Sequence, residues 1–587
     1  MQDSSQRRRT ARRSAVVAVA ALALSAAGAG VAGVAAGQTR GQPNARSAGV
    51  ARGAQAVTRG HVRLVGRSSP ARAARARFAP TGVRHPLPVL VPRKDTGTTA
   101  RRTAVPRVQS SAVTAAATKV LNKFDGVNAI QNKRTAGFDD EPPDEGLGAG
   151  HGYVANFVNT TGAIYNRAGT MLGAPFYLNT FFKEDPATNT SDPRVFYDNQ
   201  AQRWYATVVE YKFNKSFTAV AESHVDLASS MSADPTGRWR VFRIHGSNLN
   251  HANCPCLPDY PMLGFDHQNV YVTTAEFTST LDDYHGAQLF AISKKQLLAG
   301  AAKPNMVWFQ NLAVGGELAG HVQPALTYGN SPAEFLVSST GNGASSSFLA
   351  VWAVTNPGSV TSGNGMPALG VRLISSEHYA QPPNARTPIG FCNGNDCAKG
   401  GEKTSGLLAT DFDETFEVQY INGRVVTTLH TAVNIAGDSA TRSGVAWFVI
   451  HPDVSGRVVT PNTEVARQGY LARKGQYLLY PHINMTSDGS MAVVFGLTAP
   501  NVKPAAAYAV APPGAGFGPI QVYAAGRFPD NGFSGTPGWG NLGRWGDYSN
   551  GQIVPGTKQV WLATQYIPNK GDGNANWGNK IVHLQLP

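Results

Sequence analysis

A repeat of similar short segments along the chain is the feature that most constrains its fold. Each segment joins a turn, often ending in proline, to an alternating strand, a polar turn and a second strand. The segments begin near residues 142, 192, 259, 323, 409, 480 and 547, a mean spacing of about 67 residues. A unit of that length holds four short strands and their loops, as one blade of a β-propeller does.

Composition supports a fold made of strands and turns. The chain has 63 glycines and 37 prolines, and only 15% of its residues are charged. This profile suits turn-rich β structure better than helical bundles. The sequence therefore predicts an all-β protein, a seven-bladed β-propeller over residues 125–587. We expect the last strand, Lys580–Leu586, to complete the first blade, because a ring of sheets must leave no open edge.

Residues 1–36 have the pattern of a signal peptide. A group of arginines precedes an uncharged run from Ser14 to Ala36 that ends in small residues. These arginines are Arg7, Arg8, Arg9, Arg12 and Arg13. We therefore expect cleavage near Ala36 and a secreted, extracellular protein with no membrane span after cleavage. The alternative is an uncleaved anchor, since the run is about long enough to cross a bilayer.

The net charge of +15 comes from the N-terminal part of the chain. Residues 1–110 hold 20 lysines and arginines against Asp3 and Asp95, so they carry +18 and the remaining residues carry −3. The nearly neutral remainder gives no reason to expect nucleic-acid binding. Residues 37–115 are rich in alanine, arginine and glycine, and the sequence predicts that they form a disordered basic arm.

Four cysteines occur in two short motifs, CPC and CNGNDC. Cys254, Cys256, Cys392 and Cys397 are candidates for disulfides, which export permits. Local pairing of Cys392 with Cys397 is sterically easy. A Cys254–Cys256 bridge closes a very tight ring, so a cross-link between the two motifs remains open. Zinc binding is the alternative, which the spacing disfavours because neither motif is C-x₂-C and no histidine lies at finger-like spacing.

Several motifs together resemble a known group of proteins. They are CPC, DYPMLGFD, GAQLFAISKKQLLAG, RQGYLARKGQYLLYPHINM, GRWGDYSNG and NWGNKIV. As a set they are similar to a functionally uncharacterised family of exported bacterial β-propeller proteins, which is loosely sialidase-like. The resemblance covers roughly residues 125–587. It implies the propeller fold and says little about chemistry.

Charged and aromatic residues lie in the turns that begin the repeats. Such turns surround one mouth of a propeller, so their side chains are expected to converge there. The candidates for ligand binding are Asp192, Arg194, Glu276, Arg544, Asp547 and Tyr548. We expect an extracellular ligand, a glycan or a protein, to bind at this mouth of the channel. The structural alternative is that these residues lock neighbouring blades through turn hydrogen bonds and core packing.

Two other functions stay open at this point. Sialidase-like glycoside hydrolysis requires an arginine cluster, an acid and a tyrosine nucleophile. Against it, no complete Ser-x-Asp-x-Gly-x-x-x-Trp motif occurs, and the arginine-containing VFRIHG at residues 241–246 lies in the second blade. The other function is that of a structural cell-surface protein anchored by the basic arm. Acyl transfer and nucleotide chemistry have no support, because the chain has no G-x-S-x-G elbow, P-loop or Rossmann glycine pattern.

Calcium is the one cofactor that the sequence suggests. The stretch FDDEPPDEG offers Asp140, Glu141 and Asp144 as hard oxygen ligands. DFDETFE, residues 411–417, is a second acidic stretch. Neither matches the EF-hand pattern, and a solvated acidic loop is the alternative. We expect the protein to be a monomer.

Overall fold

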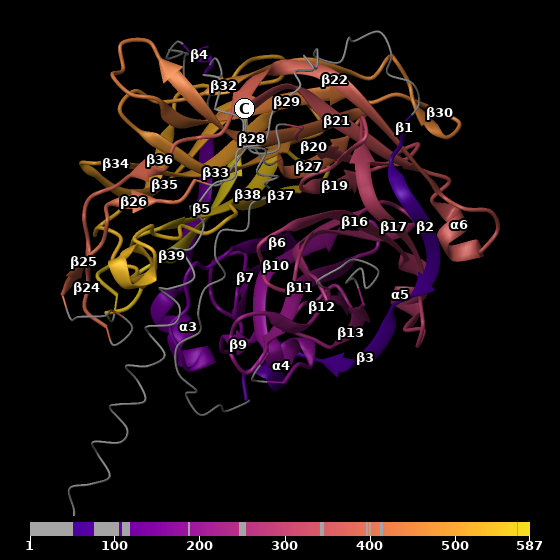
Figure 1. Ribbon diagram of the computed structural model, residues 1–587, viewed down its shortest axis with the longest axis horizontal. Helices are drawn as coiled ribbons and strands as arrows, with labels where there is room; N and C mark the ends of the chain where they lie inside the picture. The colour runs from indigo at the N-terminus through magenta and orange to yellow at the C-terminus, as the bar shows by residue number, and fades with distance from the viewer. Residues whose placement is uncertain are drawn as a thin grey trace, which may run out of the picture. The chain divides into compact units, whose positions relative to one another are not determined.

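The computed structural model describes most of the chain from residue 51 onward (Figure 1). The described residues are 51–75, 105–108, 118–185, 188–245, 254–340, 345–394, 397, 401–410, 415–571 and 573–587. The predicted signal peptide, residues 1–36, lies outside them, as do Asp411, Asp413 and Glu414 of the second acidic stretch.

Strands make up most of the regular structure, so the predicted all-β class is confirmed. The helices are short. They are α2 (Pro70–Ala73), α3 (Ala129–Ala136), α4 (Leu178–Phe182), α5 (Lys294–Ala299) and α6 (Gly358–Ser362). In the described part of the chain, no helix combines the length and the apolarity that a bilayer span requires.

The strands form seven antiparallel units of four strands each within the described residues, numbered here in chain order. The first strands are β6 (Gly146–Gly150), β10 (Asn189–Asp198), β14 (Leu257–Phe265), β19 (Val322–Tyr328), β27 (Thr415–Ile421), β33 (Tyr477–Met485) and β37 (Asn550–Val554). The second strands are β7 (Tyr153–Val158), β11 (Arg203–Phe213), β15 (Asn269–Phe277), β20 (Glu334–Ser338), β28 (Arg424–Ile435), β34 (Met491–Ala499) and β38 (Gln559–Tyr566). The third strands are β8 (Thr161–Asn166), β12 (Val220–Ser230), β16 (Tyr284–Ser293), β21 (Ser345–Thr355), β29 (Arg442–His451), β35 (Val502–Ala511) and β39 (Gly578–Gln585). The fourth strands are β9 (Phe176–Tyr177), β13 (Trp239–Ile244), β17 (Asn305–Val314), β22 (Ala368–Ala380), β32 (Glu464–Leu471), β36 (Gln521–Ala524) and β5 (Lys119–Asn128).

The first strands of the units contact one another in sequence. Each contacts the first strand of the next unit, and β37 of unit 7 contacts β6 of unit 1. Where neighbouring first strands pair, they run parallel, as at Ala325 opposite Val418. The contacts therefore close into a ring of first strands, and these strands begin close to the seven repeat starts predicted from the sequence.

Apolar side chains from several units share one core cluster. Leu263 and Phe290 of unit 3 belong to the same buried cluster as Val493 of unit 6 and Leu562 of unit 7. The strand β34, MAVVFGLTA, is buried along its whole length. Because a middle strand such as β34 is covered on both faces, its sequence is a continuous apolar run and does not alternate between polar and apolar residues.

The way the ring closes differs from the prediction for Lys580–Leu586. The last strand, β39, lies third in unit 7, next to β38, and the N-terminal strand β5 pairs with its other edge. Unit 1 is complete without it, because β9 already pairs with β8. β39 pairs with β38, its neighbour in sequence, and not with a strand of unit 1. The strand that crosses between the ends of the ring is instead β5, which lies just before unit 1 in the chain.

The N-terminal segment 51–68, here called the strap, corrects a second prediction. Three of its strands pair in turn with the fourth strands of units 4, 3 and 2. They are β1 (Ala51–Arg52), β2 (Ala54–His61) and β3 (Arg63–Ser68). The expected disordered arm over residues 37–115 is therefore wrong for the strap. The outer edges of these fourth strands would otherwise carry unpaired backbone groups. The composition of the strap does not show that it pairs with those edges.

The remaining short strands are not among the four strands of any unit. Four of them, in two pairs, join β22 to β27: β23 (Ala385–Arg386) with β26 (Leu407–Leu408), and β24 (Phe391–Cys392) with β25 (Glu402–Lys403). The others are β4 (Arg107–Val108), β18 (Glu317–Leu318), β30 (Val454–Ser455) and β31 (Val458–Val459), with the 3₁₀ turns η1 (Phe533–Gly535) and η2 (Pro537–Trp539).

Both cysteine pairs are local. Cys254 pairs with Cys256 and Cys392 with Cys397, so the structure contains no cross-link between the two motifs. Cys392 and Cys397 pack with Phe533 in a small apolar cluster.

Two truncations separate the role of β5 from that of the strap. A chain that begins at residue 118 lacks the strap and keeps β5, whereas a chain that begins at residue 129 lacks both. We expect the shorter chain to lose its cooperative thermal transition, because β39 becomes an open edge and the buried Val127 is removed. The longer chain should keep a cooperative transition at a lower melting temperature. Circular dichroism measures both, and identical melting curves would contradict the role given to β5.

Candidate ligand-binding site

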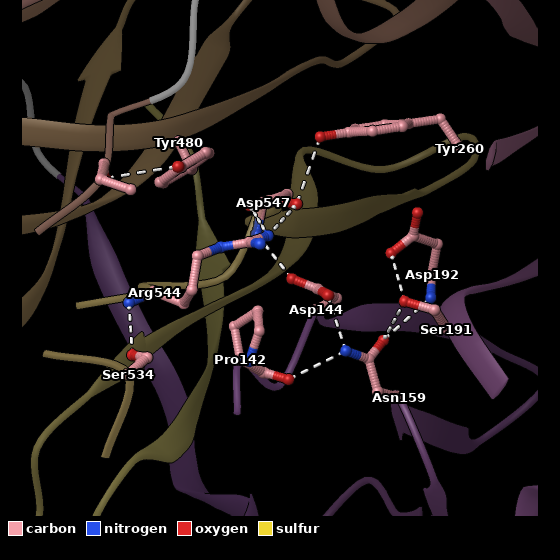
Figure 2. Close-up of polar contacts among 11 residues, drawn as sticks. Pro142, Asp144, Asn159, Ser191, Asp192, Tyr260, Tyr480, Ser534, Arg544 and Asp547 are labelled. Atoms are coloured by element: carbon pink, nitrogen blue, oxygen red, sulfur yellow. Dashed lines mark hydrogen bonds and ion pairs between the residues drawn. The ribbon is translucent and has the colours of Figure 1, made fainter. Parts of the chain in front are cut away.

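A local backbone feature recurs near the start of most first strands. Non-glycine residues adopt positive φ at Asp192 (55°), Tyr260 (51°), Glu417 (49°) and Tyr480 (46°), and each lies where the strand register shifts. Asp144 has a φ of 39° just before β6. Such bulges redirect a side chain out of the regular alternation. Here they bring polar and aromatic side chains of successive units toward one another (Figure 2).

An ion pair and two carboxylates form the centre of this cluster. Arg544 Nη2 lies 3.0 Å from Asp547 Oδ2, and the backbone N–H of Asp547 donates to Asp144 Oδ1 at 2.8 Å. Asn159 Nδ2 donates to Asp144 Oδ2 at 2.6 Å. The cluster therefore joins unit 7 to unit 1 through charged and amide groups (Figure 2).

Units 2 and 3 are connected to the same cluster. The backbone N–H of Asp192 donates to Asn159 Oδ1 at 2.8 Å, and Ser191 Oγ donates to Asp192 Oδ1 at 3.0 Å. The hydroxyl of Tyr260 donates to Asp547 Oδ2 at 3.2 Å. Asn159 thus holds Asp144 and Asp192 in place together, while Tyr260 reaches the ion pair from the other side (Figure 2).

Burial and mutual repulsion keep part of the cluster protonated. Burial, and then the charge of Asp547, raise the pKa of Asp259 to about 7. Burial also raises the pKa of Asp192, with added repulsion from Asp259 and Asp547, and a side-chain hydrogen bond joins Asp192 to Asp259. Burial and the charges of Asp547 and Asp192 raise the pKa of Asp144. The raised pKa values of both groups favour a protonated carboxyl in the Asp192–Asp259 pair.

Beside the acidic cluster lies a second group of charged side chains. The Arg194 guanidinium carbon stacks 4.2 Å from the centre of the Tyr548 ring, and Nη2 lies 3.9 Å from Glu417 Oε2. His482 Nδ1 lies at the same distance from that oxygen. Burial raises the pKa of Glu417 to about 8, although the charge of Arg194 opposes this, and lowers the pKa of His482 to about 3.

Arg194 and Glu417 are buried without a full set of hydrogen bonds. Only 1% of Arg194 and 0% of Glu417 is exposed. Within the described part of the chain, Nε and Nη1 of Arg194 and both carboxyl oxygens of Glu417 have no hydrogen-bond partner. Buried polar groups are normally satisfied, so these atoms are available to another molecule.

Five of the six residues predicted to bind a ligand lie in these two groups. They are Asp192, Arg194, Arg544, Asp547 and Tyr548. Glu276 lies instead on the second strand β15, where its Oε2 accepts a hydrogen bond from Gln288 Nε2 at 3.2 Å.

Sequence reasoning missed several members of the site. Tyr260 occupies the repeat position that Asp192 occupies in unit 2, and Asp259 precedes it as Ser191 precedes Asp192, so the DYP motif was the available signal. Glu417 was assigned to an acidic stretch. His482 follows a proline at the corresponding position in unit 6.

The site lies beneath a cap and does not face an open mouth. The cap comprises the described residues of 385–410 together with residues 529–547. Its two segments are joined by backbone hydrogen bonds from Ser405 to Gly535, 2.9 Å, and from Ala409 to Gly543, 2.8 Å. The hydroxyl of Tyr480 donates to the Ala409 carbonyl at 3.3 Å. A ligand can therefore reach the site from this side only if the cap moves.

The candidate calcium ligands have other partners. Asp140 accepts a hydrogen bond from Trp577 Nε1 through its carbonyl, 2.8 Å, and Glu141 Oε2 accepts one from the Ser534 N–H, 3.0 Å. Asp144 belongs to the acidic cluster. Among the described residues, the groups of three side chains close enough to share a cation lie elsewhere, so calcium at Asp140, Glu141 and Asp144 stays a prediction.

One of those groups, Glu184, His224 and Asp226, already holds a cation. Arg243 donates from Nε and Nη2 to the two carboxyl oxygens of Asp226, at 3.1 and 3.3 Å, and pairs with Glu184. The guanidinium occupies the place that a metal ion would need.

Comparisons with known proteins give weak similarities. The sequence matches no protein-family model and no curated protein. A solved structure of a protein of unknown function from Dyadobacter fermentans is 12% identical, with a TM-score of 0.31, and covers 68% of this chain and 96% of its own. An α-L-arabinanase from Penicillium chrysogenum is 10% identical, with a TM-score of 0.29 and coverages of 67% and 92%. A Trypanosoma rangeli sialidase is 8% identical, with a TM-score of 0.32 and coverages of 75% and 58%.

These similarities are too distant to carry an argument about this chain. The resemblance to a family of exported proteins has no family model behind it and stays a prediction. What the protein binds must therefore be inferred from its own residues.

The pH dependence of stability reports on Asp259. Its folded pKa of about 7 exceeds the ordinary aspartate value of about 4, so the folded protein holds a proton that the unfolded chain releases. This stabilisation is complete below about pH 4 and is lost as the pH rises through about 7. Since Asp259→Asn cannot ionise, we expect it to raise the melting temperature more at pH 8 than at pH 5, relative to wild type.

Only the difference between variant and wild type isolates this effect. The low pKa of buried His482, about 3, acts in the opposite direction, because stability is lost when the pH falls below the ordinary histidine range. Glu222→Gln is the matched control, since its side chain is 74% exposed. A difference between Asp259→Asn and wild type that is constant from pH 5 to pH 8 would argue against the raised pKa.

Proposed function

We propose that the seven units are the blades of a seven-bladed β-propeller. The closed ring of first strands supports this, since inner strands meet around the axis of a propeller. The pairing of β5 with β39 supports it as well, because strands from the two ends of the described ring then share one blade. A channel mouth in such a fold collects the turns that precede every inner strand.

The proposed function is binding of an extracellular glycan that carries a carboxylate, in the site beneath the cap. One observation carries it: among the described residues, two nitrogen atoms of the buried Arg194 guanidinium and both oxygens of the neighbouring Glu417 carboxyl have no hydrogen bond. Burial of such groups without partners is costly. A ligand that supplies a carboxylate and hydroxyl groups removes this cost, whereas a purely structural site has no need to create it.

The charge of the site favours an acidic ligand. A pKa of about 8 keeps Glu417 mostly protonated at neutral pH, so Arg194 has no full counter-charge there. Guanidinium groups bind carboxylates through two parallel hydrogen bonds. Tyr548 and Tyr260, whose ring centres lie 5.8 Å apart, place aromatic rings beside the polar groups, as small-molecule sites commonly do.

An array of uronate- and sialate-containing oligosaccharides, printed with their neutral counterparts, tests the proposal. We expect wild type to bind acidic members, and Arg194→Gln to weaken that binding at least tenfold, since a hydrogen bond to a charged group contributes about 1.5 kcal/mol or more. Titration calorimetry on the positive glycans measures the change.

The matched control for Arg194→Gln lies at the opposite ends of the first strands. Asn422→Ala changes a residue that lines a cavity of about 280 Å³ there, together with Phe265 and Tyr328. It should leave glycan affinity unchanged. If Asn422→Ala lost glycan binding and Arg194→Gln retained it, the binding site would have to lie at the opposite ends of the first strands. No binding to any glycan, or specific binding to a protein alone, would refute the proposal.

A second candidate function, glycoside hydrolysis, has one observation in its favour. Asp259 lies beside Asp192 in the cluster, and burial with the charge of Asp547 raises its pKa to about 7. Glycoside hydrolases need a carboxylic acid that stays protonated near neutral pH to protonate the leaving group. Asp259 has that property, and Asp547, which pairs with Arg544, would supply a carboxylate in the same cluster.

Turnover of aryl glycosides and sialosides separates hydrolysis from binding alone. If wild type releases the aryl alcohol, Asp259→Asn should lower kcat by about 100-fold or more, because an amide cannot donate the proton in the same way. Its affinity for the intact glycan should change little. Undiminished turnover in Asp259→Asn would exclude it as the acid, and no turnover by wild type would leave binding as the function.

A further inference from the structure

A histidine lies against the Cys254–Cys256 pair, at a place distant in sequence. Cys256 comes directly before β14, and His285 lies near the start of β16 in the same unit. His285 Nδ1 is 3.4 Å from Cys256 Sγ and 3.8 Å from Cys254 Sγ. The two sulfur atoms and this nitrogen all lie within 4.8 Å of one another, a separation that one metal ion can bridge.

The other nitrogen of His285 faces a carboxylate. Nε2 lies 3.9 Å from Asp283 Oδ2, and the Asp283 side chain is 63% exposed. A carboxylate on that side favours the tautomer with the proton on Nε2, which leaves the lone pair of Nδ1 directed at the sulfur atoms. Metal-binding histidines are commonly oriented in this way.

The position of the Cys254–Cys256 pair suits a chemical role better than a role in stabilising the fold. The Cys254–Cys256 bridge encloses a single residue, Pro255, so it restricts the unfolded chain very little. The Cys392–Cys397 bridge is different, since it packs with Phe533 in the cap. In the described residues, no group of metal-ligating side chains includes Cys392 or Cys397.

Solvent can reach the neighbourhood of the pair. Pro255 lines a cavity of about 400 Å³, together with Ser223, His224 and Arg243. Cys254 is half-buried and Cys256 is buried. A small thiol and a hydrated cation can therefore approach from this side, and a bound ion would keep one position open for water.

We propose that Cys254, Cys256 and His285 form a redox-controlled site for one divalent zinc-like cation. In the disulfide form the sulfur atoms are bonded to each other and the site is closed to metal. A dithiol reductant breaks the S–S bond, delivers two electrons and two protons to the two sulfur atoms, and is itself oxidised to a disulfide. The cation then binds both thiolates and Nδ1 of His285, and two protons are released to solvent.

Cobalt(II) is the probe, because its bonds to thiolate sulfur give intense near-ultraviolet absorption. The purified protein is reduced with dithiothreitol, freed of reductant without oxygen, and titrated with Co²⁺. We expect one Co²⁺ per chain with sulfur-to-metal absorption, displacement by Zn²⁺, and release of the metal when the disulfide is re-formed. The untreated disulfide form should show no such absorption. Circular dichroism before and after reduction verifies that the strands persist.

Variants assign the signal to its ligands. Cys254→Ser/Cys256→Ser should abolish the absorption, and His285→Asn should weaken Co²⁺ binding at least tenfold. Asp283→Asn should weaken it by a smaller factor, since outer partners of a metal ligand tune affinity. The matched control, Cys392→Ser/Cys397→Ser, should retain the full signal and removes any contribution from the second pair.

Three results would overturn the proposal. The first is the absence of sulfur-to-metal absorption in the reduced, folded protein. The second is loss of that absorption in the Cys392→Ser/Cys397→Ser control. The third is an affinity for Co²⁺ that is unchanged in His285→Asn. If reduction unfolds the wild type, the control variant is reduced instead, because it carries only the Cys254–Cys256 pair. Failure of that variant to bind Co²⁺ while folded counts equally against the site.

Discussion

The pairing of β5 with β39 is the interaction on which the ring of strands depends. The strand β5, which precedes unit 1 in the chain, covers the outer edge of β39 in unit 7. The first and last parts of the ring are therefore held together by this pairing. Without it, units 7 and 1 would still meet through the contact of β37 with β6 and through polar contacts such as Asp547 N–H to Asp144. Because the acidic cluster contains Asp144 next to unit 1 and Asp547 next to unit 7, the geometry of the site depends on this closure.

The repeated bulges explain how so regular a framework makes an irregular site. A strand alternates its side chains between two faces, so a uniform strand would direct the same positions inward in every unit. A residue of positive φ breaks that rule locally, and the residue differs from unit to unit: Asp192, Tyr260, Glu417 and Tyr480. The backbone device is thus shared, while the chemistry is specific to each unit. Non-glycine residues in this conformation carry a cost in backbone energy, which is consistent with function at these positions.

The parts of the structure that sequence could predict are those encoded locally. Each repeat carries its own turns and strands, so the all-β class and the places where the first strands begin could be read from the chain. Most candidate ligand residues were found in the same way, since Asp192, Arg194 and Asp547 lie in the turn motifs themselves. Glu276 was predicted to lie with the other candidates, but it does not belong to the cluster. It lies on a second strand, and the cluster residues lie at the starts of first strands.

The features that sequence could not predict depend on contacts between distant segments. The strap was read as disordered because its composition is basic and its partner edges belong to units that come much later. The cap could not be foreseen, because its two segments are far apart in sequence and are joined by backbone hydrogen bonds such as those between Ser405 and Gly535 and between Ala409 and Gly543. His285 was not linked to Cys256 because two strands, β14 and β15, separate them in sequence.

The cap and the site are coupled because they share residues. Arg544 and Asp547 belong to the second cap segment, where their side chains form an ion pair and the backbone N–H of Asp547 donates to Asp144 in the cluster. A motion that opens the cap therefore withdraws a cation from a group of buried carboxyls whose pKa values are already raised. The open state would then favour either protonation of those carboxyls or a ligand that offers donors to them. If a ligand enters through such an opening, its binding would therefore be linked to the protonation of these carboxyls.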